Sequence, residues 1–302
     1  MRNVSGCSRL NKVSFSILLS EGERVNYFDV SILAVIQGLA ELLPVSSSAH
    51  VIMTEKLLGL DPAAPDMTLL LVMLHTGTMF AVIVYFWNNW RETYFSSGSA
   101  FKKNVFLIIL ATVVTGVVGL ALMKLIKYFF AANADTFEIE SLFSNSKIIA
   151  SGLAAAGLLI IFSSRLKEKD RGELSPLSAA GIGFVQGLCL PFRGFSRSGA
   201  TISTGLSLGV ARQRAEEFSF ALAVVLTPAV IVKEGLRAFN SGSAGTVAVS
   251  SGVLLPSLVG MLLSFVAGLL ALRWLSRWLE HDRWHLFGGY CLCAAALIGW
   301  LG

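Results

Sequence analysis

The chain has 302 residues, of which 54% are hydrophobic and 14% are charged, and its mean hydropathy is +0.69. A water-soluble domain carries about a quarter charged residues, so this composition excludes one and indicates a membrane protein with several spans. The net charge is +5, but Lys and Arg are scattered between apolar runs and form no basic stripe, which argues against a nucleic-acid-binding protein.

Residues 1–26 are predicted to be a loosely ordered extension. Their apolar stretch, residues 13–19, is short and interrupted by serine, so it makes a poor signal-peptide core. We expect one integral-membrane catalytic domain over residues 27–302. The cysteines lack metal-ligand spacing and are assigned no chemistry; they are Cys7, Cys189, Cys291 and Cys293.

Six apolar runs are each near the ~20 residues that a membrane-spanning helix needs. They are residues 69–87, 105–123, 148–163, 218–236, 252–272 and 286–301. Four shorter runs are residues 29–41, 50–60, 178–190 and 200–210. Because these reach only about 16–20 Å into a hydrocarbon core of ~30 Å, we expect two re-entrant helical hairpins. The predicted fold class is therefore an all-α polytopic membrane protein with six transmembrane helices plus two re-entrant hairpins.

A polar segment interrupts the apolar sequence between the first two short runs. It reads Gln37-Gly-Leu-Ala-Glu41-Leu-Leu-Pro44-Val-Ser46-Ser47-Ser48-Ala-His50. An ionisable group at bilayer depth costs roughly 2.5–3.5 kcal/mol on insertion scales, so Glu41 and His50 should line a wet cavity or have partners. This favours a functional site over an interfacial loop.

A second polar segment repeats the order of the first, with Gln-Gly-Leu, then proline, then a cluster of hydroxyls. It reads Gln186-Gly-Leu-Cys-Leu-Pro191-Phe-Arg193-Gly-Phe-Ser196-Arg197-Ser198-Gly199-Ala-Thr201. The echo predicts an internal duplication, with repeats over about residues 29–147 and 148–302. Paired, interrupted hydrophobic segments in two halves are typical of a site near the bilayer midplane.

Basic residues divide unevenly between the loops, and the richer side, which includes Lys167, is expected to be cytoplasmic. The other side, with Ser243 and both termini, is then the outer face. The first hairpin enters from outside and the second from the cytoplasm, so the repeats are inverted. The pocket between them is expected to open to the outer, periplasmic face.

The second segment has the residues of an anion site at the start of a short helix. Guanidinium groups make two-point contacts with phosphate oxygens, glycine lets backbone N–H groups approach, and a helix N-terminus adds partial positive charge. Arg197, between two serines, is our main phosphate ligand. Arg193 is included as a substrate-binding candidate, although an arginine that snorkels to the headgroups also explains it.

Inverted repeats bring the two hairpin tips together, so the first segment should face Arg197 across one pocket. Ser47 or His50 could attack phosphorus, and Glu41 could accept a proton or hold a divalent cation. We favour Ser47 as nucleophile and leave His50 open. His75 is interpreted as a helix-packing residue. Four other acidic residues are interpreted as solvated helix-end charges: Asp61, Asp66, Glu216 and Glu217.

Both segments resemble the signatures of the undecaprenyl-diphosphate phosphatases, also called bacitracin-resistance proteins. These signatures are (Glu/Gln)-x-x-x-Glu followed by Pro-Val-Ser-Ser-x-x-His, and Pro-Gly-x-Ser-Arg-Ser-Gly-x-Thr, and the similarity covers the chain from about residue 29. The resemblance implies hydrolysis of the terminal phosphate of undecaprenyl diphosphate in the bacterial plasma membrane, which regenerates the carrier lipid for cell-wall synthesis.

The resemblance also implies catalytic roles for Glu41, Ser47, His50 and Arg197, and a divalent cation, Mg²⁺ or Ca²⁺, with Glu41 as its ligand. The remaining candidates are assigned to substrate binding: Gln37, Ser46, Ser48, Arg193, Ser196, Ser198, Gly199 and Thr201.

The chain departs from the family pattern in two places. Gln37 stands where many members have a first glutamate, so Glu41 must act as the single carboxylate, and residues 192–193 are inserted between Pro191 and Gly194. A transporter of polyprenyl phosphates is the alternative function, because inverted repeats with broken helices are also transporter architecture. The expected partners are the lipid substrate and the bilayer, with a homodimer as one expected assembly.

Overall fold

The computed structural model describes residues 26–60, 65–130, 146–166, 172–192, 194–241 and 251–301. The regular elements within these ranges are all helices. They are α1 (Tyr27–Leu42), α2 (Ser47–Leu58), α3 (Pro65–Tyr94), α4 (Gly98–Phe130), α6 (Ser146–Ser164), α7 (Pro176–Cys189), α8 (Arg197–Ser207), α9 (Arg212–Ser241), α10 (Ser251–Glu280) and α11 (Trp284–Leu301). Several predictions fall outside these residues, namely those on 1–25, Arg193, Lys167 and Ser243.

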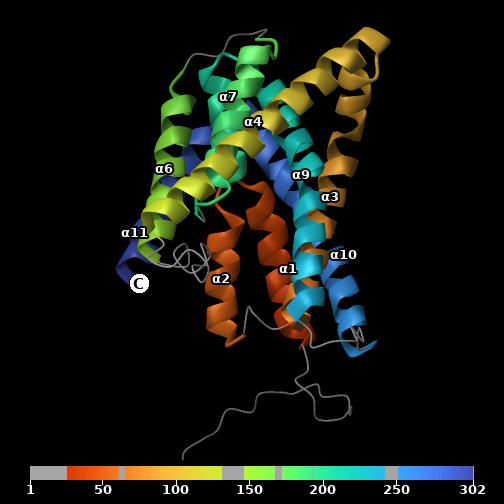
Figure 1. Ribbon diagram of the computed structural model, residues 1–302, viewed down its shortest axis with the longest axis vertical. Helices are drawn as coiled ribbons and strands as arrows, with labels where there is room; N and C mark the ends of the chain where they lie inside the picture. Colours follow the sequence, from red (N-terminus) through yellow and green to blue (C-terminus); the bar gives the residue numbers. More distant parts are fainter. Residues whose placement is uncertain are drawn as a thin grey trace, which may run out of the picture.

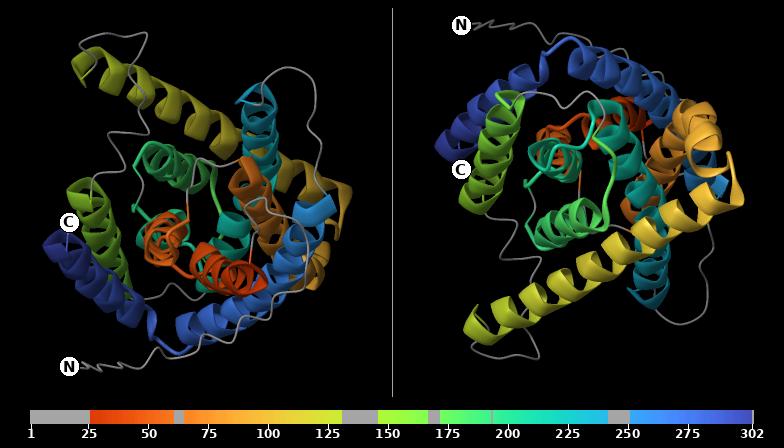
Figure 2. Two further views of the ribbon diagram at one scale, coloured as in Figure 1. Left: turned by 90° about the horizontal axis from the view of Figure 1, so that it is seen from below. Right: turned by 90° about the horizontal axis from the view of Figure 1, so that it is seen from above.

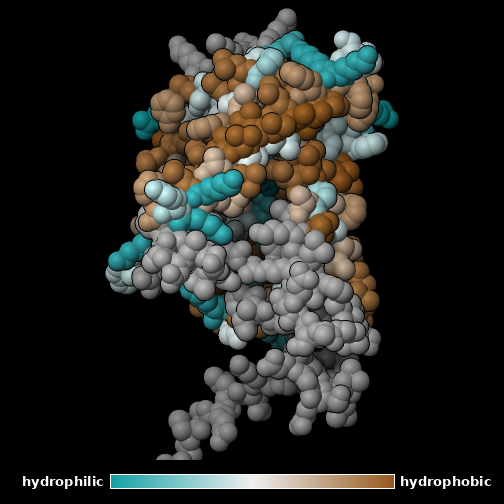
Figure 3. All heavy atoms as spheres, viewed as in Figure 1, coloured by the Kyte–Doolittle hydropathy of each residue, from teal (hydrophilic) through white to brown (hydrophobic). Residues whose placement is uncertain are grey.

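The all-helical prediction is confirmed for the described chain, and each of the six long apolar runs lies within one helix. Within the described ranges, four helices are long and apolar enough to cross a membrane: Met67–Tyr94, Gly98–Phe129, Ser146–Ser164 and Leu254–Glu280. The protein is therefore an integral membrane protein. Hydrophobic residues cover much of the face drawn in Figure 3, with hydrophilic residues at its top edge and lower down.

The four short helices pair as the short apolar runs predicted. α1 packs against α2, and α7 packs against α8. In Figure 1, α1 and α2 lie in the lower half of the molecule and α7 lies in the upper half. Figure 2 shows that the short helices occupy the centre, surrounded by the long ones. The loops that end α1 and precede α8 therefore meet in the interior.

The ends of the short helices follow from local sequence. Asn26 caps α1 by accepting a hydrogen bond from the Phe28 N–H at 3.0 Å. Ser175 caps α7 and forms a capping box with Ser178, and Pro176 occupies the first turn, where its missing N–H costs nothing. α1 and α7 therefore each have a capped start, and the opposite end of each helix reaches the interior.

Small residues allow the short helices to approach the long ones closely. A Cβ atom added at Gly38 on α1 would lie 2.6 Å from the Ala267 Cβ on α10. One added at Gly183 on α7 would lie 2.4 Å from the Ala111 carbonyl oxygen on α4. The first helix of each hairpin thus packs against a long helix from the other half of the chain.

The prediction that Glu216 and Glu217 are solvated is wrong. They are only 4% and 1% exposed. Glu217 accepts hydrogen bonds from Arg214 at 2.8 Å and Asn89 at 3.1 Å, and Glu216 accepts one from Ser276 at 2.6 Å. The carboxylates are buried because α9 packs against α3 and α10; these helices supply the Asn89 and Ser276 donors, and Arg214 lies on α9 itself.

Candidate functional site

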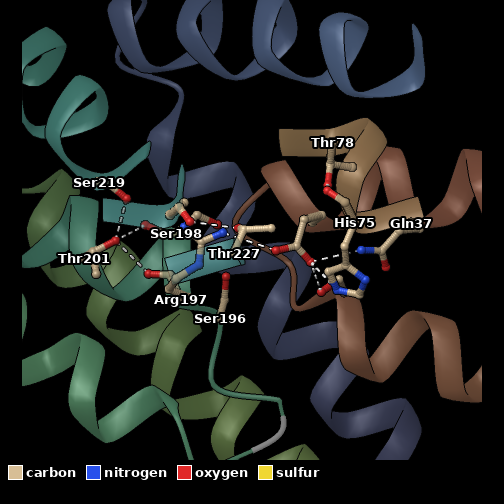
Figure 4. Close-up of polar contacts among 12 residues, drawn as sticks. Gln37, His75, Thr78, Ser196, Arg197, Ser198, Thr201, Ser219 and Thr227 are labelled. Carbon is tan, nitrogen blue, oxygen red and sulfur yellow. Dashed lines mark hydrogen bonds and ion pairs between the residues drawn. The ribbon is translucent and has the colours of Figure 1, made fainter. Parts of the chain in front are cut away.

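The two hairpins meet through an ion pair between their tips. Glu41 lies in the last turn of α1, and Arg197 is the first residue of α8. The Arg197 Nη2 atom lies 3.2 Å from the Glu41 Oε1 atom (Figure 4). A second contact joins the same regions, because the Ser198 hydroxyl donates to the Leu43 carbonyl oxygen at 3.2 Å. The structure therefore brings together the acid and the guanidinium that the sequence placed 156 residues apart.

The other Glu41 oxygen accepts two more hydrogen bonds from the first polar segment. The Ser47 hydroxyl donates to Glu41 Oε2 at 2.6 Å, and Gln37 Nε2 donates to the same atom at 3.2 Å. Ser47 is the first residue of α2, where backbone N–H groups have no partner within the helix. Ser48 is exposed. Of the two serines, only Ser47 has its hydroxyl beside the carboxylate.

Ser46 connects the turn to α2 in an unusual backbone conformation. Its φ is 68° and its ψ is 97°, a region that non-glycine residues rarely adopt. The residue is buried, and its side chain makes no capping hydrogen bond. Such outliers cluster at functional sites, where surrounding contacts hold them.

Both ring nitrogens of His50 have partners. Nδ1 lies 2.8 Å from the Ser46 carbonyl oxygen, and Nε2 lies 2.6 Å from the hydroxyl of Tyr290 on α11. The two rings are stacked, with centroids 5.8 Å apart. His50 is thus near the catalytic turn but engaged on both sides.

The hydroxyls at the start of α8 contact protein groups. Ser196 caps the helix by accepting from the Gly199 N–H at 3.3 Å. Thr201 Oγ1 lies 2.7 Å from the Arg197 carbonyl oxygen and 2.6 Å from the Ser219 hydroxyl. A Cβ at Gly199 would lie 3.1 Å from the Pro44 Cβ, so glycine allows the hairpins to approach. These contacts fix the helix start that carries Arg197.

Arg197 retains one donor for an incoming anion. Its Nη1 atom is buried and has no hydrogen-bond partner in the part of the chain that the structure describes. An unpaired buried donor is unfavourable, so a ligand that accepts from it gains the full benefit of pairing. This unpaired atom belongs to the same guanidinium that contacts Glu41 through Nη2.

His75 is a site residue that the sequence analysis set aside. Its Nε2 lies 3.8 Å from Glu41 Oε2, and its Nδ1 lies 2.8 Å from the Leu71 carbonyl oxygen (Figure 4). This contact gives His75 a polar neighbour in addition to the packing role on α3 that the sequence predicted. The signal that could have found it is the one that identified His50: an ionisable group within an apolar run.

A divalent cation at the hairpin contact would need oxygen ligands from the protein. Among the described residues there is no group of three or more His, Cys, Asp or Glu side chains that could hold a metal ion. Glu41 offers the one carboxylate at the hairpin contact, and Arg197, Ser47 and Gln37 already donate to it. The described protein groups therefore form no dedicated cage for a divalent cation at this contact.

Comparison with known proteins agrees with the motifs. The family described as "Bacitracin resistance protein BacA" matches residues 30–297. The chain belongs to this family. It is 64% identical over 272 residues to undecaprenyl-diphosphatase 2 of Acinetobacter baylyi, covering 89% of this chain and 95% of that protein. It is 32% identical over 285 residues to the undecaprenyl-diphosphatase of Korarchaeum cryptofilum, covering 88% and 96%. The BacA resemblance of the two polar segments is thereby confirmed.

Proposed function

We propose that this BacA-family protein is an undecaprenyl-diphosphatase that hydrolyses undecaprenyl diphosphate to undecaprenyl phosphate and inorganic phosphate. This activity recycles the carrier lipid of cell-wall synthesis and confers resistance to bacitracin. The observation that carries the proposal is the meeting of Ser47, Glu41 and Arg197 where the hairpins touch. A hydroxyl, a carboxylate and a guanidinium in contact are the groups that phosphoryl transfer needs.

The reaction follows from these contacts. The Ser47 oxygen attacks the terminal phosphorus and its proton passes to Glu41, the oxygen that already accepts it at 2.6 Å. The bond between that phosphorus and the bridging oxygen breaks, and undecaprenyl phosphate leaves with this oxygen. Water then attacks the phosphorus of the phosphoserine, and the bond from phosphorus to the Ser47 oxygen breaks. The Ser47 oxygen takes back the proton held by Glu41, and inorganic phosphate leaves with the two protons of the water. Arg197 Nη1 and the first N–H groups of α2 bind the charged oxygens during both steps.

Ser47 is the better nucleophile candidate because of the contacts of His50. A histidine must present an unprotonated nitrogen to phosphorus, and both nitrogens of His50 are engaged by Ser46 and Tyr290. The Ser47 hydroxyl instead contacts its base directly. The substrate-binding assignments that remain part of the proposal are Gln37, Ser46, Arg193, Ser196, Ser198, Gly199 and Thr201. Ser48, whose side chain is exposed, has at most a minor part in binding.

A divalent cation, Mg²⁺ or Ca²⁺, belongs to the proposal as a partner of the diphosphate. Glu41 would hold it together with substrate oxygens. When bound, it would offset negative charge on the diphosphate.

The proposed membrane arrangement has six spans and two re-entrant hairpins in inverted repeats. α9 and α11 would add to the four long apolar helices as the fifth and sixth spans. Support comes from the opposite placement of α1 and α7 in Figure 1 and from the exchange of packing partners between halves. The protein would lie in the bacterial plasma membrane, with the site open to the outer face.

Phosphate release by the purified protein tests the function. Protein in detergent is incubated with undecaprenyl diphosphate and a divalent cation, and inorganic phosphate is measured. No gradient exists in detergent, so a transporter would release none. Steady phosphate release that Ser47→Ala removes supports the enzyme, and its absence from the wild-type protein would favour the polyprenyl-phosphate transporter.

His75→Leu should lower turnover about tenfold, the factor that corresponds to one lost polar interaction. The change removes the ring nitrogen 3.8 Å from Glu41 and leaves an apolar side chain on α3. His281→Leu is the matched control, because His281 makes the same Nδ1 contact to a carbonyl four residues earlier, at 2.7 Å, but is exposed. Equal turnover in the two variants would show that His75 only packs.

A further inference from the structure

A chain of hydrogen bonds runs from α11 to the catalytic turn. It begins at the Tyr290 hydroxyl, passes through the His50 ring by contacts of 2.6 Å and 2.8 Å, and ends at the Ser46 carbonyl oxygen. That carbonyl belongs to the residue immediately before Ser47. Tyr290 and His50 are 240 positions apart in the sequence. These hydrogen bonds therefore connect α11 to the peptide group that precedes Ser47, the proposed nucleophile.

The Ser46 carbonyl group determines which atom is the donor in each of the two hydrogen bonds of the His50 ring. A carbonyl oxygen only accepts, so the proton on the His50 ring that faces Ser46 is on Nδ1. In the neutral ring Nε2 is then an acceptor, and the Tyr290 hydroxyl donates to it. Ring stacking at an interplanar angle of 17° adds a second restraint. Tyr290 thus favours one tautomer and one orientation of His50.

The Ser46 backbone needs such a restraint. Its φ of 68° lies in the left-handed region, and its side chain makes no capping bond that would hold it there. The His50 Nδ1–H group donates a hydrogen bond to the Ser46 carbonyl oxygen and so restrains this peptide unit. A shift of that peptide unit would rotate the start of α2 and move the Ser47 hydroxyl away from Glu41, with which it makes a 2.6 Å contact.

We propose that Tyr290 is a positioning residue of the phosphatase, acting through His50 to hold the Ser46 carbonyl and hence the Ser47 hydroxyl. In this arrangement His50 is a bridge between α11 and the catalytic turn. Tyr290 touches neither the reacting phosphorus nor Glu41 in the proposed reaction. The inference rests on the proposed function, since it assigns Tyr290 to the site that carries it.

Tyr290→Phe tests the kinetic consequence. The variant keeps the stacked ring and loses only the hydroxyl that donates to His50. We expect kcat to fall about tenfold, the effect of one lost hydrogen bond, with KM nearly unchanged because the anion-binding groups remain. Tyr85→Phe is the matched control: it removes a tyrosine hydroxyl that donates to Ser276 at 2.9 Å, with no histidine involved. Thermal unfolding of both variants checks that each is folded.

Nitrogen spectra of histidine test the chain itself. The protein has four histidines, so ¹⁵N-histidine labelling gives few signals, and His50→Gln identifies those of His50. In the wild-type protein we expect a protonated Nδ1 and an Nε2 that accepts a hydrogen bond. Tyr290→Phe should shift the His50 Nε2 signal, and Tyr85→Phe should leave it in place.

The kinetic and spectroscopic measurements test the positioning role of Tyr290 separately from the proposed phosphatase function. The spectra need no turnover, so a wild-type protein without phosphatase activity would defeat the proposed function while the chain could still be judged. An unmoved His50 signal in Tyr290→Phe would overturn the positioning role. So would a kcat equal to that of Tyr85→Phe.

Discussion

We expect Ser47→Ala to abolish phosphate release, with a loss of at least about a thousandfold, because it removes the oxygen that attacks phosphorus in the proposed reaction. The structure places this hydroxyl 2.6 Å from Glu41, at the first residue of α2. The measurement is initial-rate phosphate release by purified protein at saturating lipid. The side chain is small and partly exposed, so the fold should survive the change.

Ser48→Ala is the matched control for this experiment. It makes the same chemical change one residue later, on an exposed side chain, and should cost less than about threefold. Near-normal turnover of Ser47→Ala, together with an inactive His50→Ala, would instead support attack by histidine. Isolation of a phosphate attached to His50 would decide between the two routes.

The hairpins and their contact could be predicted because their signal is local. Apolar runs too short to span the bilayer flank each polar segment, and the order of Gln, Pro and hydroxyl residues recurs. From this we predicted that the hairpin tips bring Glu41 and Arg197 together, and the structure places them in contact at 3.2 Å. The ends of the four short helices lie within about three residues of the predicted runs, whereas α3, α4, α9 and α10 continue beyond theirs. Polar residues at the ends of these long helices hide their full length from a search for apolar runs.

Residues outside the two segments could not be placed in the same way. His75 lies in an apolar helix whose orientation depends on how α3 packs, so the sequence did not show that its ring faces Glu41. Tyr290 reaches His50 only because α11 returns to the hairpin tip. Glu217 is buried by donors that include Asn89, 128 residues away. The surroundings of each of these three residues depend on contacts between helices that are distant in the sequence. A local sequence pattern does not show which side chains meet in such contacts.

Glu41 contacts side chains from four helices. Its two oxygens contact groups from α1, α2, α3 and α8 through Gln37, Ser47, His75 and Arg197. A carboxylate with several donors is held in one position, which a base needs if it is to take a proton without reorganisation. The same contacts explain why one carboxylate can suffice where Gln37 replaces a second: the amide donates to Glu41 and helps to orient it.

Arg197→Lys should lower turnover about a hundredfold, the usual cost of one lost donor to transition-state oxygens, while the protein remains folded. Arg197 binds Glu41 through Nη2. Its Nη1 is buried without a hydrogen-bond partner among the described residues, and in the proposed reaction it donates to the phosphate. Lysine keeps the charge but has a single nitrogen, so it cannot hold the acid and the anion with the same planar geometry.

Arg214→Lys is the control for the general loss of a guanidinium. Arg214 also uses both terminal nitrogens, toward Glu217 and Asn104, and its side chain is 24% exposed against 23% for Arg197. This substitution should lower the melting temperature and leave kcat close to the wild-type value, because its partners lie away from the hairpin contact. The assignment of Arg197 to phosphate binding therefore predicts opposite patterns: lost turnover with an unchanged melting temperature for Arg197→Lys, and the reverse for Arg214→Lys. A fall in stability with little loss of kcat in Arg197→Lys would mean that its guanidinium only joins the hairpins.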